Sequence, residues 1–397
     1  MRVVQINAVA YGSTGRIMFQ LADSLASGGD DVLCTAGFTW KRCNREDFFL
    51  TSNIFEKTIH TYLARLTGRI GCFSHFATAR LLKRLDMFSP DVIHLHNVHG
   101  WFVNLPMLFG YIKRKKIPVV WTFHDCWPMT GHCPHFDMIG CDKWKSGCHH
   151  CALYREYPQC WFDRSDLMYG LKKKWFTGVE NLTVVTPSCW LKGIVKESFL
   201  GCYPVRVINN GIDLTIFRPR PGAFREQYNC EDKKLVLGVA YAWDEKKGLD
   251  VFLELAERLG DDYRIVLVGT DENVEKHFSE NIISIRRTQN QCELAEIYTA
   301  SDVFVNPTRE DNYPTVNMEA LACGTPVITF ETGGSPEILC DTCGCVVRRD
   351  DIDELERQIR RVCVDRPFST EMCLKHASCF AQEYAVGKYL DLYRSIK

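Results

Sequence analysis

The sequence contains 397 residues, of which 46% are hydrophobic and 24% are charged, a composition typical of a globular enzyme large enough for two domains. No stretch approaches the roughly 18 uninterrupted apolar residues of a membrane-spanning helix, and nothing is typical of a nucleic-acid-binding module, so we expect neither a membrane span nor binding to DNA or RNA. Residues 1–215 contain 25 Lys and Arg against 17 Asp and Glu, and the remainder contains 23 against 32, so the net charge of −1 hides a basic first part.

This basic first part suits an anionic partner such as a phospholipid surface or a lipid diphosphate. Runs of Lys and Arg at 113–116 and 172–174 contribute to it. The alternative is that these charges lie on solvated surfaces, where charge varies from one part of a chain to another, and that they bind no partner. The N-terminus lacks a secretion signal, because its apolar run is short and glycines stand in place of a cleavage site. We therefore expect a cytoplasmic protein that can bind peripherally to the inner face of the plasma membrane.

Short apolar runs rich in β-branched residues alternate with helical patterns along the chain. The predicted strands cover residues 3–7, 32–35, 92–96, 119–124, 182–186, 205–209, 235–240, 264–268, 283–286, 303–306 and 326–330. The predicted helices cover residues 17–26, 249–259, 293–300, 317–322, 354–364 and 381–396. Continuous apolar strands separated by helices indicate parallel sheets covered on both faces. We predict an α/β fold with two Rossmann-like, doubly wound domains that face a cleft.

The boundary between the domains is predicted in the segment 213–221, which combines prolines with a loss of periodicity. The N-terminal domain then covers residues 1–215 and contains a Cys-rich insertion at about 126–160. The C-terminal domain covers residues 216–380, and a final helix covers 381–397. Because ligands of open parallel sheets bind beyond the carboxyl ends of the strands, the default site is the cleft between the two sheets.

A glycine-containing loop, residues 11–16, directly follows the first predicted strand and opens a helix. Glycine lets the backbone approach a ligand closely, and the amides at the start of a helix can bind phosphate oxygens. The third glycine of a dinucleotide-binding fingerprint is missing. A tight turn without a ligand would have the same sequence. The candidate ligand-binding residues in this loop are Gly12, Gly15 and Arg16.

Histidines gather at the ends of two neighbouring predicted strands. His94, His96 and His99 belong to the first group, and His124 and Asp125 end the next strand. An imidazole at the carboxyl end of a strand can form a hydrogen bond with a substrate hydroxyl. The alternative is a histidine whose hydrogen bonds are satisfied by the backbone.

Twenty cysteines are many for a chain without a secretion signal, and a disulfide framework is not expected in a reducing compartment. Four of them have the spacing of a metal-ligand set, namely Cys133, Cys141, Cys148 and Cys151. A Cys-x-x-Cys turn and two further thiolates fit a tetrahedral structural zinc, which would stabilise a polar loop. The alternative is packed thiols without a metal. A catalytic zinc is not expected, because all four positions would be filled.

Two lysines, Lys246 and Lys247, stand between the strand 235–240 and the helix 249–259. Positive charge near the N-terminus of a helix is unfavourable with respect to the helix dipole, so an anion bound there would account for the pair. A phosphate is the predicted ligand. A solvated pair of charges is the alternative.

The most specific pattern is the acidic segment 306–328, which follows a strand and opens a helix. Carboxylates there can accept paired hydrogen bonds from the vicinal diols of ribose and hexoses. We expect Glu319 in the first turn of its helix, where the helix dipole alone would also favour it. A second glycine loop, 332–337, follows the next strand and suits a phosphate or a sugar.

The acidic segment, the lysine pair and the first glycine loop together resemble family 4 of the GT-B glycosyltransferases, over almost the whole chain. Residues 95–104, 122–133, 185–198 and 208–219 resemble bacterial transferases that assemble capsule, colanic-acid and other exopolysaccharide units. The resemblance implies a retaining transferase that uses a nucleotide-diphosphate sugar, needs no catalytic metal and serves surface polysaccharide biosynthesis, with a polyprenyl-diphosphate-linked saccharide as the expected acceptor. It also implies that the final helix crosses back onto the first domain.

The resemblance assigns roles residue by residue. The family's Glu-x7-Glu pair matches Asp311, which would face the donor sugar, and Glu319, which would bind the ribose; Glu310, one residue away, is the alternative to Asp311. Lys247 matches the lysine that meets the diphosphate. The arginine that the family usually has five residues before this lysine falls on Ala242 here, so Lys246 would supply the second positive charge. The implied catalytic residues are His124, Lys247, Asp311 and Glu319. The implied donor-binding residues are Gly12, Gly15, Arg16, Lys246, Lys247, Glu310, Asp311, Asn312, Thr315, Val316 and Glu319.

Two other functions fit the same architecture. A nucleotide-sugar epimerase would need no acceptor, and a sugar-binding relic would have no activity. The presence of His124, Lys247, Asp311 and Glu319 argues against the relic. The sequence does not identify the base, the sugar or the acceptor.

Overall fold

The computed structural model describes residues 1–40 and 43–397, which form two compact units. The N-terminal unit contains Met1–Ile208 and Val386–Lys397, and the C-terminal unit contains Asn209–Ala385. The predicted boundary, 215–216, lies a few residues further along the chain. The difference arises because Ile212, which the prediction placed in the N-terminal domain, is buried in the core of the C-terminal unit, where it pairs with Ala381.

The N-terminal unit contains a parallel sheet of seven strands in the order β3-β2-β1-β4-β5-β6-β7. Its strands are β1 (Arg2–Val9), β2 (Asp31–Phe38), β3 (Phe48–Leu50), β4 (Val92–Leu95), β5 (Val119–Thr122), β6 (Leu182–Thr186) and β7 (Val205–Val207). Val3 pairs with Val32 on one side and with Val92 on the other. The interior residues of these central strands are buried, as expected for a parallel sheet with both faces covered, although Gln5, Asn7 and His94 among them are polar.

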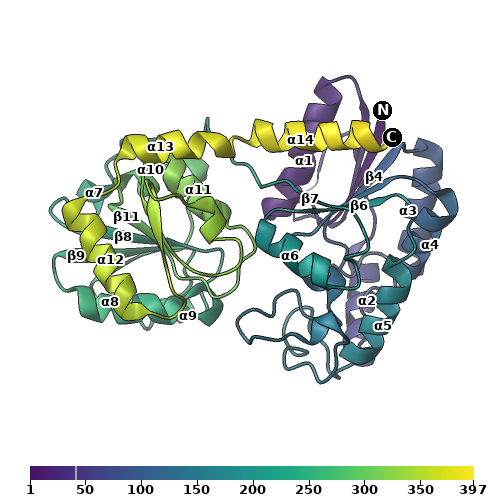
Figure 1. The fold of residues 1–397 in the computed structure, drawn as a ribbon, viewed down its shortest axis with the longest axis horizontal. Helices are drawn as coiled ribbons and strands as arrows, with labels where there is room; N and C mark the ends of the chain where they lie inside the picture. Colours follow the sequence, from purple (N-terminus) through teal and green to yellow (C-terminus); the bar gives the residue numbers. More distant parts are fainter. Residues whose placement is uncertain (41–42) are drawn as a thin grey trace. The chain divides into compact units, whose positions relative to one another are not determined.

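The helices of the N-terminal unit connect and cover these strands (Figure 1). They are α1 (Gly12–Ser27), α2 (Ile54–Thr67), α3 (His75–Phe88), α4 (Leu105–Lys115), α5 (Ser165–Phe176), α6 (Cys189–Glu197) and the end of α14 (Gln382–Ile396). Residues 123–164 contain no α-helix or strand, and only the short 3-10 helices η1 (Trp127–Met129) and η2 (Lys143–Lys145). The predicted Cys-rich insertion therefore is a long loop after β5.

The C-terminal unit contains a parallel sheet of six strands in the order β10-β9-β8-β11-β12-β13. Its strands are β8 (Lys234–Val239), β9 (Tyr263–Val268), β10 (Ile282–Ile285), β11 (Val303–Asn306), β12 (Val327–Phe330) and β13 (Gly344–Val347). Its helices are α7 (Phe224–Gln227), α8 (Leu249–Leu259), α9 (Glu272–Glu275), α10 (Gln291–Ala300), α11 (Thr315–Ala322), α12 (Ile352–Asp365), α13 (Thr370–Ala377) and the 3-10 helices η3 (Glu245–Lys247), η4 (Pro336–Ile338) and η5 (Ser378–Phe380).

Two hydrophobic cores cover the faces of this second sheet. One core is formed with α10, α11 and α13, and the other with α8 and α12, which lie on opposite sides of the sheet in Figure 1. Both units are thus doubly wound parallel α/β domains, and the predicted fold class is confirmed.

Several details differ from the prediction. Strands β3 and β13 were not predicted: β3 has three residues, and β13 begins with a glycine between two cysteines. Strands β4 and β5 end at Leu95 and Thr122, so His96 and His124 lie in the loops that follow. Helix α11 begins at Thr315 and not at residue 317.

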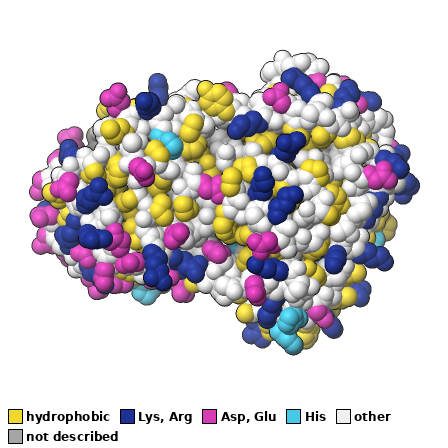
Figure 2. Space-filling model, viewed as in Figure 1, with side chains coloured by type: hydrophobic (Ala, Val, Ile, Leu, Met, Phe, Trp, Pro, Cys, Tyr) yellow, Lys and Arg dark blue, Asp and Glu magenta, His cyan; other side chains and the backbone are white. Residues whose placement is uncertain are grey.

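None of the helices among the described residues is both long enough and apolar enough to span a membrane. On the face shown in Figure 2, Asp and Glu side chains are dense over the C-terminal unit, at the left of the view. This distribution agrees with the excess of acidic residues in the second part of the sequence.

Candidate functional site

In each sheet the predicted site residues follow strands at the point where the strand order reverses. In the C-terminal unit, β8 lies between β9 and β11, and the chain runs first to one side and then to the other. Lys246 and Lys247 follow β8, the acidic loop follows β11, and the second glycine loop follows β12. In the N-terminal unit, β1 and β4 flank the corresponding point, and residues 11–16 follow β1. Such switch points are where open α/β sheets bind their ligands.

The two lysines are held by a short turn that their neighbours in sequence create. The carboxylate of Asp244 accepts a hydrogen bond from the backbone N–H of Lys247 at 3.0 Å. Gly248 ends the turn with φ +76°, and a Cβ there would lie 2.6 Å from the carbonyl oxygen of Pro307. Only glycine fits both the conformation and this approach. The turn therefore lies directly against the start of the acidic loop.

Each lysine of the turn is paired with an acid of the loop. Lys247 Nζ lies 2.7 Å from Asp311 Oδ2 and 3.5 Å from the carbonyl oxygen of Glu310. Lys246 Nζ lies 3.6 Å from Glu310 Oε2, and the Glu310 side chain is nearly buried. The four charged residues that the sequence singled out thus form one cluster, although they are more than 60 positions apart.

Arg309 holds the acidic loop in place, although it was not among the predicted site residues. Its guanidinium forms paired hydrogen bonds with the Asp250 carboxylate at 2.8 and 2.7 Å, and a further bond with Asp350 at 2.7 Å. It also donates to the carbonyl oxygen of Glu245 at 2.6 Å. The hydrogen bonds that Arg309 donates to the Asp250 carboxylate raise the pKa of Arg309 further, so it stays charged. The partners come from η3, from α8 and from the turn between β13 and α12, and no local sequence pattern predicts them.

Glu319 lies on α11, with its carboxylate at the edge of the core. The helix starts at Thr315, so Glu319 is in the second turn, and the expected position in the first turn is wrong. The hydroxyl of Tyr298 donates to Glu319 Oε2 at 3.3 Å. Burial, with Glu319 beside it, raises the pKa of Tyr298 well above its usual range. The tyrosine lies on α10, was missed in the sequence, and orients the carboxylate.

The remaining predicted residues of this unit lie around the start of α11. Thr315 and Val316 are the first two residues of the helix, and no side chain caps it because Pro314 stands at that position. The carbonyl oxygen of Asn312 accepts from the backbone N–H of Gly334 at 3.0 Å, which joins the acidic loop to the second glycine loop. Together these segments offer lysine ammonium groups, helix amides and carboxylates within one region, as a nucleoside diphosphate would need.

In the N-terminal unit the two glycines of the first loop have different roles. Gly12 has φ +67°, and the space beside its Cα is open. A Cβ on Gly15 would lie 2.7 Å from the carbonyl carbon of Ala10, so this glycine allows α1 to pack close to the end of β1. Only Gly12 thus has open space beside it, while Arg16 is exposed on α1.

The imidazole of His124 belongs to a buried chain of neutral groups. His96 Nε2 lies 2.8 Å from Gln5 Oε1, and His96 Nδ1 lies 3.1 Å from His124 Nε2. Burial lowers the pKa of His96 well below its usual range and that of His124 to about 4. Because the amide oxygen can only accept, neutral His96 donates from Nε2 and accepts at Nδ1. His124 then donates from Nε2, and its Nδ1 is the acceptor.

Two further histidines support this chain. His94 lies between the Tyr393 hydroxyl at 2.6 Å and the Thr122 hydroxyl at 2.8 Å, so α14 is tied to the histidine cluster. His99 Nε2 lies 3.3 Å from Asp125 Oδ2. The predicted group of histidines therefore divides into His124, which is half-buried, and three side chains that are fully buried, His94, His96 and His99. Gln5 and Tyr393 were not predicted, since they lie far away in the sequence.

The four predicted cysteine ligands lie in the loop after β5. Cys133 donates a hydrogen bond to Cys151, which raises the pKa of Cys133 and lowers that of Cys151. Cys148 Sγ accepts from the backbone N–H of Gly131 at 3.1 Å, and Cys141 packs against the same core. Among the residues that the structure describes, no three of these sulfurs lie within 4.8 Å of one another. The predicted zinc site stays a prediction.

Lys172 does not lie on a basic surface, although the run of lysines at 172–174 suggested one. Its side chain is fully buried, and Nζ donates to the carbonyl oxygens of Trp127 and Thr130 at 2.7 and 2.9 Å. Nζ also lies 3.3 Å from the centre of the Trp127 ring, and burial lowers the pKa of the lysine well below its usual range. Lys172 is therefore part of the core behind the Cys-rich loop and not of a basic surface.

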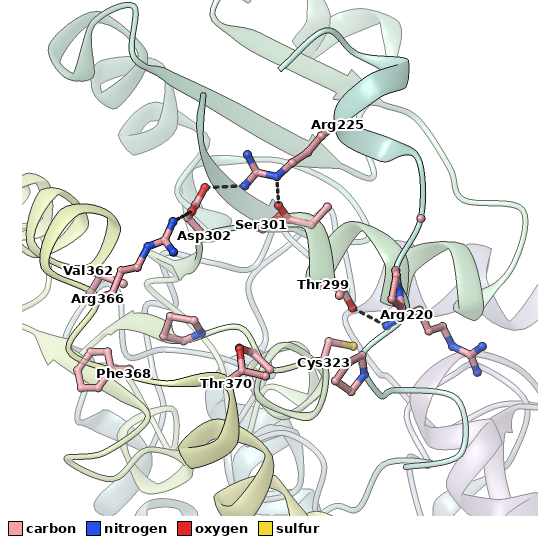
Figure 3. A pocket seen from close by; sticks show the side chains of 16 residues that line it. Arg220, Arg225, Thr299, Ser301, Asp302, Cys323, Val362, Arg366, Phe368 and Thr370 are labelled. Atoms are coloured by element: carbon pink, nitrogen blue, oxygen red, sulfur yellow. Dashed lines mark hydrogen bonds and ion pairs between the residues drawn. The ribbon is translucent and has the colours of Figure 1, made fainter. Parts of the chain in front are cut away.

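A cavity of about 430 Å³ lies at the opposite edge of the second sheet (Figure 3). Asp302 and Pro326, which line it, precede β11 and β12, whereas the predicted site follows these strands. Arg225 and Arg366 both approach the Asp302 carboxylate, at 2.7 and 3.8 Å. None of the predicted site residues lines this cavity, so it is separate from the candidate site.

Comparisons with known proteins identify the two units. The family model described as "Glycosyltransferase Family 4" matches residues 14–216, slightly more than half of the chain, and that of "Glycosyl transferases group 1" matches residues 222–375. WcaC of Escherichia coli (strain K12), named as a colanic acid biosynthesis glycosyl transferase, is 25% identical over 83% of this chain and 86% of its own length.

Solved structures agree in fold. Sucrose-phosphate synthase of Thermosynechococcus elongatus has a TM-score of 0.70 at 15% identity, over 100% of this chain and 99% of that chain. Anabaena HepE in complex with UDP-glucose has a TM-score of 0.67 at 13% identity and covers 100% of both chains.

Proposed function

The chain belongs to glycosyltransferase family 4, and from that premise we propose that it is a retaining enzyme that transfers a sugar from a nucleoside diphosphate sugar to a saccharide acceptor in surface polysaccharide biosynthesis. The observation that carries the proposal is the cluster of Lys246, Lys247, Glu310 and Asp311 at the switch point of the second sheet. It combines cations for a diphosphate with carboxylates for sugar hydroxyls.

In this proposal the lysine turn and α11 bind the diphosphate. The ammonium groups of Lys246 and Lys247 and the first amides of α11, at Thr315 and Val316, supply positive charge to it. As the bond between the sugar and the phosphate breaks, negative charge grows on the departing diphosphate. Groups that are already oriented toward that charge stabilise the transition state more than the ground state. No metal ion is needed for this step.

The acids and His124 bind the hydroxyls of the donor. A carboxylate has lone pairs for several hydrogen bonds, so Asp311 can keep its bond with Lys247 and still accept from the sugar. Glu319 can likewise bind the ribose diol while it accepts from Tyr298. His124, neutral with Nδ1 as the acceptor, is assigned to a sugar hydroxyl. Gly12 and Arg16 are assigned to the phosphate side of the donor.

The reaction is tested by the release of free nucleotide from UDP-, GDP- and dTDP-sugars, with and without lipid-linked saccharide acceptors. Release that depends on the acceptor, with the anomeric configuration retained in the product, supports the proposal. Conversion of the donor sugar without an acceptor would instead identify an epimerase. A preceding thermal-shift screen with the same donors selects the base and sugar, because tight binding raises the melting temperature.

For the acceptor, we assign a polyprenyl-diphosphate-linked saccharide met at an anionic membrane surface. The basic run 113–116 gives little support to membrane binding, because Lys115 pairs with Asp86 and Lys116 pairs with Glu180. The run also lies before β5, at the edge of the sheet opposite to His124. A better surface is the exposed apolar face of α2, which we call the α2 face; it consists of Ile54, Phe55, Ile59, Tyr62 and Leu66.

The surroundings of the α2 face fit a membrane interface. Phe76, at the start of α3, is 81% exposed, and Trp161 contacts Tyr62 edge-to-face at 5.5 Å. Helix α3 lies beside α2, since Arg80 pairs with Glu56, and it also exposes Lys83 and Arg84. A helix with exposed aromatic and aliphatic side chains next to basic residues is typical of proteins that bind the surface of an anionic bilayer.

Vesicle sedimentation tests this surface. We expect binding to vesicles that contain phosphatidylglycerol but not to pure phosphatidylcholine, and weaker binding as salt is raised. Phe55→Asp combined with Phe76→Asp should abolish it. Val364→Asp, at an exposed valine of the C-terminal unit, is the matched control and should bind normally. Binding that is indifferent to lipid charge would overturn the electrostatic part of the proposal.

We also propose that Cys133, Cys141, Cys148 and Cys151 bind a structural zinc. Buried Lys172, which lies behind these cysteines, supports it, because a Zn(Cys)4 site carries a formal charge of about −2 that would compensate a buried ammonium. Cys148→Ser combined with Cys151→Ser should lose about one zinc per chain and loosen the loop after β5, as seen by hydrogen exchange. Full zinc content in this variant would contradict the assignment.

A further inference from the structure

A second cluster of metal-binding side chains lies in the C-terminal unit. The donor atoms of Cys340, Cys343 and His376 all lie within 4.8 Å of one another. Cys340 and Cys343 flank the turn between η4 and β13, and His376 lies on α13, more than 30 positions later. Three such groups from two separate segments converge on one point, which isolated packed thiols such as Cys230 and Cys363 do not do.

The geometry of the two sulfurs suits a metal. Cys340 Sγ and Cys343 Sγ are 3.4 Å apart. A disulfide requires about 2.05 Å, whereas two sulfurs at 2.3 Å from a tetrahedral zinc lie about 3.8 Å apart. The backbone N–H of Cys340 donates to Cys343 Sγ at 3.4 Å, so the turn already orients one sulfur. The pair therefore needs only a small adjustment to hold an ion.

The histidine is oriented in the way that metal ligands usually are. His376 Nε2 lies 2.8 Å from the carbonyl oxygen of Ile338, to which it donates. The lone pair of the neutral ring is then on Nδ1, which is available for a metal. A backbone carbonyl that fixes the tautomer of a ligating imidazole is a common supporting contact in metal sites.

A candidate for the fourth ligand, Cys373, lies one turn earlier on α13; its sulfur is not among the three donor atoms within 4.8 Å of one another and would have to turn toward the ion. Cys373 and His376 are three positions apart, so they lie on the same side of the helix. Cys373 is buried, and its Sγ lies 3.9 Å from the carbonyl oxygen of Cys343. The four residues thus form a Cys-x-x-Cys pair and a Cys-x-x-His pair, and thiolate with imidazole is the ligand set that selects zinc.

We propose that Cys340, Cys343, Cys373 and His376 bind a structural zinc ion that fastens α13 to the turn before β13. The consequence reaches the candidate site through the second glycine loop, which leads into η4. In that loop Gly334 donates to the carbonyl oxygen of Asn312 at 3.0 Å, and the Ser335 hydroxyl accepts from the Asn317 side chain at 2.8 Å. The metal would position this loop and would take no part in the chemistry.

The site is tested by the zinc content of full-length protein, purified without a metal-affinity tag under reducing conditions. Because a first zinc is proposed at Cys148 and Cys151, the experiment starts from the variant with both of these replaced by Ser. That background should retain about one zinc per chain, and Cys340→Ser combined with Cys343→Ser should remove it. Cys345→Ser is the matched control, because Cys345 Sγ faces Gln358 at 3.7 Å, and it should keep the metal.

Cobalt substitution gives a second readout that does not depend on the variant with Cys340→Ser and Cys343→Ser. Co²⁺ bound to the background protein should show the intense visible absorption of a tetrahedral thiolate site, and His376→Gln should shift it. This variant decides the question if the double serine variant does not fold. An absence of zinc and of the cobalt spectrum in the folded background, or a Cys340–Cys343 disulfide in reduced native protein, would overturn the proposal. Donor affinity, measured separately, would be unaffected by that outcome.

Discussion

The two units hold their candidate site residues with different chemistry. Ten of the twelve histidines lie in the N-terminal unit, and the polar groups behind His124 are neutral imidazoles, an amide and hydroxyls. The C-terminal unit instead uses ion pairs, with Lys246 and Lys247 against Glu310 and Asp311, and Arg309 beneath them. A neutral network can select hydroxyls without attracting phosphate, whereas a charged cluster at a strand edge suits a diphosphate.

This contrast makes the N-terminal unit the more sensitive to acid. Burial lowers the pKa of His60 to about 3 and of His124 to about 4, and it also lowers the pKa of His94, His96 and His99. Between about pH 6.5 and 4 the unfolded chain therefore binds more protons than the folded chain, and stability falls as the pH falls. Each such histidine can cost about 1.4 kcal/mol per pH unit, so together they should cost several kcal/mol.

Hydrogen exchange at pH 7 and pH 5 measures this loss unit by unit. We expect protection to fall in peptides from β4 and β5 well before it falls in peptides from β8 and β11. Burial, the largest cause of the lowered pKa of His99, sets the direction of this loss; Asp125 beside His99 opposes the loss, and Lys172 adds to it. Equal loss in both units, or greater stability at pH 5, would contradict the neutral network.

The sequence predicts the strands and helices better than it predicts the side-chain contacts between distant residues. The strands at 182–186 and 303–306 and the helix at 249–259 have the predicted bounds, because long apolar runs and clear helical periodicity specify them locally. Strand β13 was missed because a glycine and cysteines interrupt its pattern.

For the site, the lysine pair and the acidic segment were recognisable because each is continuous in the sequence. Tyr298, Arg309 and Tyr393 were not, since each acts through a partner that only the folded chain brings near. The cluster of Cys340, Cys343 and His376 was missed for the same reason, because its histidine lies on a later helix. Local patterns therefore reveal ligand-binding loops, whereas supporting contacts require the fold.

The largest effect on activity is expected from Lys247→Ala, which tests the charged cluster of the C-terminal unit. This change removes the ammonium that pairs with Asp311 and, in the proposed reaction, stabilises the departing diphosphate. We expect kcat to fall about 10²–10³-fold, as for other lost electrostatic donors. Lys233→Ala, before β8 at the opposite end of the same strand, should leave kcat unchanged. A normal rate in folded Lys247→Ala would remove this residue from the mechanism.

The two neighbouring acids should differ in their effects. Asp311→Asn keeps the shape of the side chain but removes the charge beside Lys247, and we expect kcat/KM to fall about 10–100-fold through lost hydrogen bonds to the donor sugar. Glu310→Gln should cost less, because Glu310 is turned toward Lys246. Steady-state kinetics with a saturating acceptor compares them. The reverse ranking would show that Glu310, and not Asp311, faces the sugar.

A smaller effect is expected when Glu319 is changed, and it concerns the binding of the nucleotide. Glu319→Ala removes the carboxylate assigned to the ribose, and we expect the Kd for the nucleoside diphosphate to rise about tenfold, which corresponds to one hydrogen bond of about 1.4 kcal/mol. Isothermal titration calorimetry measures it directly. The same change also leaves the buried hydroxyl of Tyr298 without this acceptor, so the free energy of unfolding should fall by about 1–3 kcal/mol.

Tyr298→Phe separates these two roles of Glu319. The change removes the hydroxyl but keeps the carboxylate, so the loss of stability should be smaller, and nucleotide affinity should stay within about twofold if the carboxylate itself binds the ribose. If Tyr298→Phe weakens nucleotide binding as much as Glu319→Ala does, Glu319 acts through its hydrogen bond with Tyr298 and not through the ribose. Its role would then be to hold α10 and α11 together. The pair of variants therefore distinguishes a ligand contact of the C-terminal unit from a contact within its core.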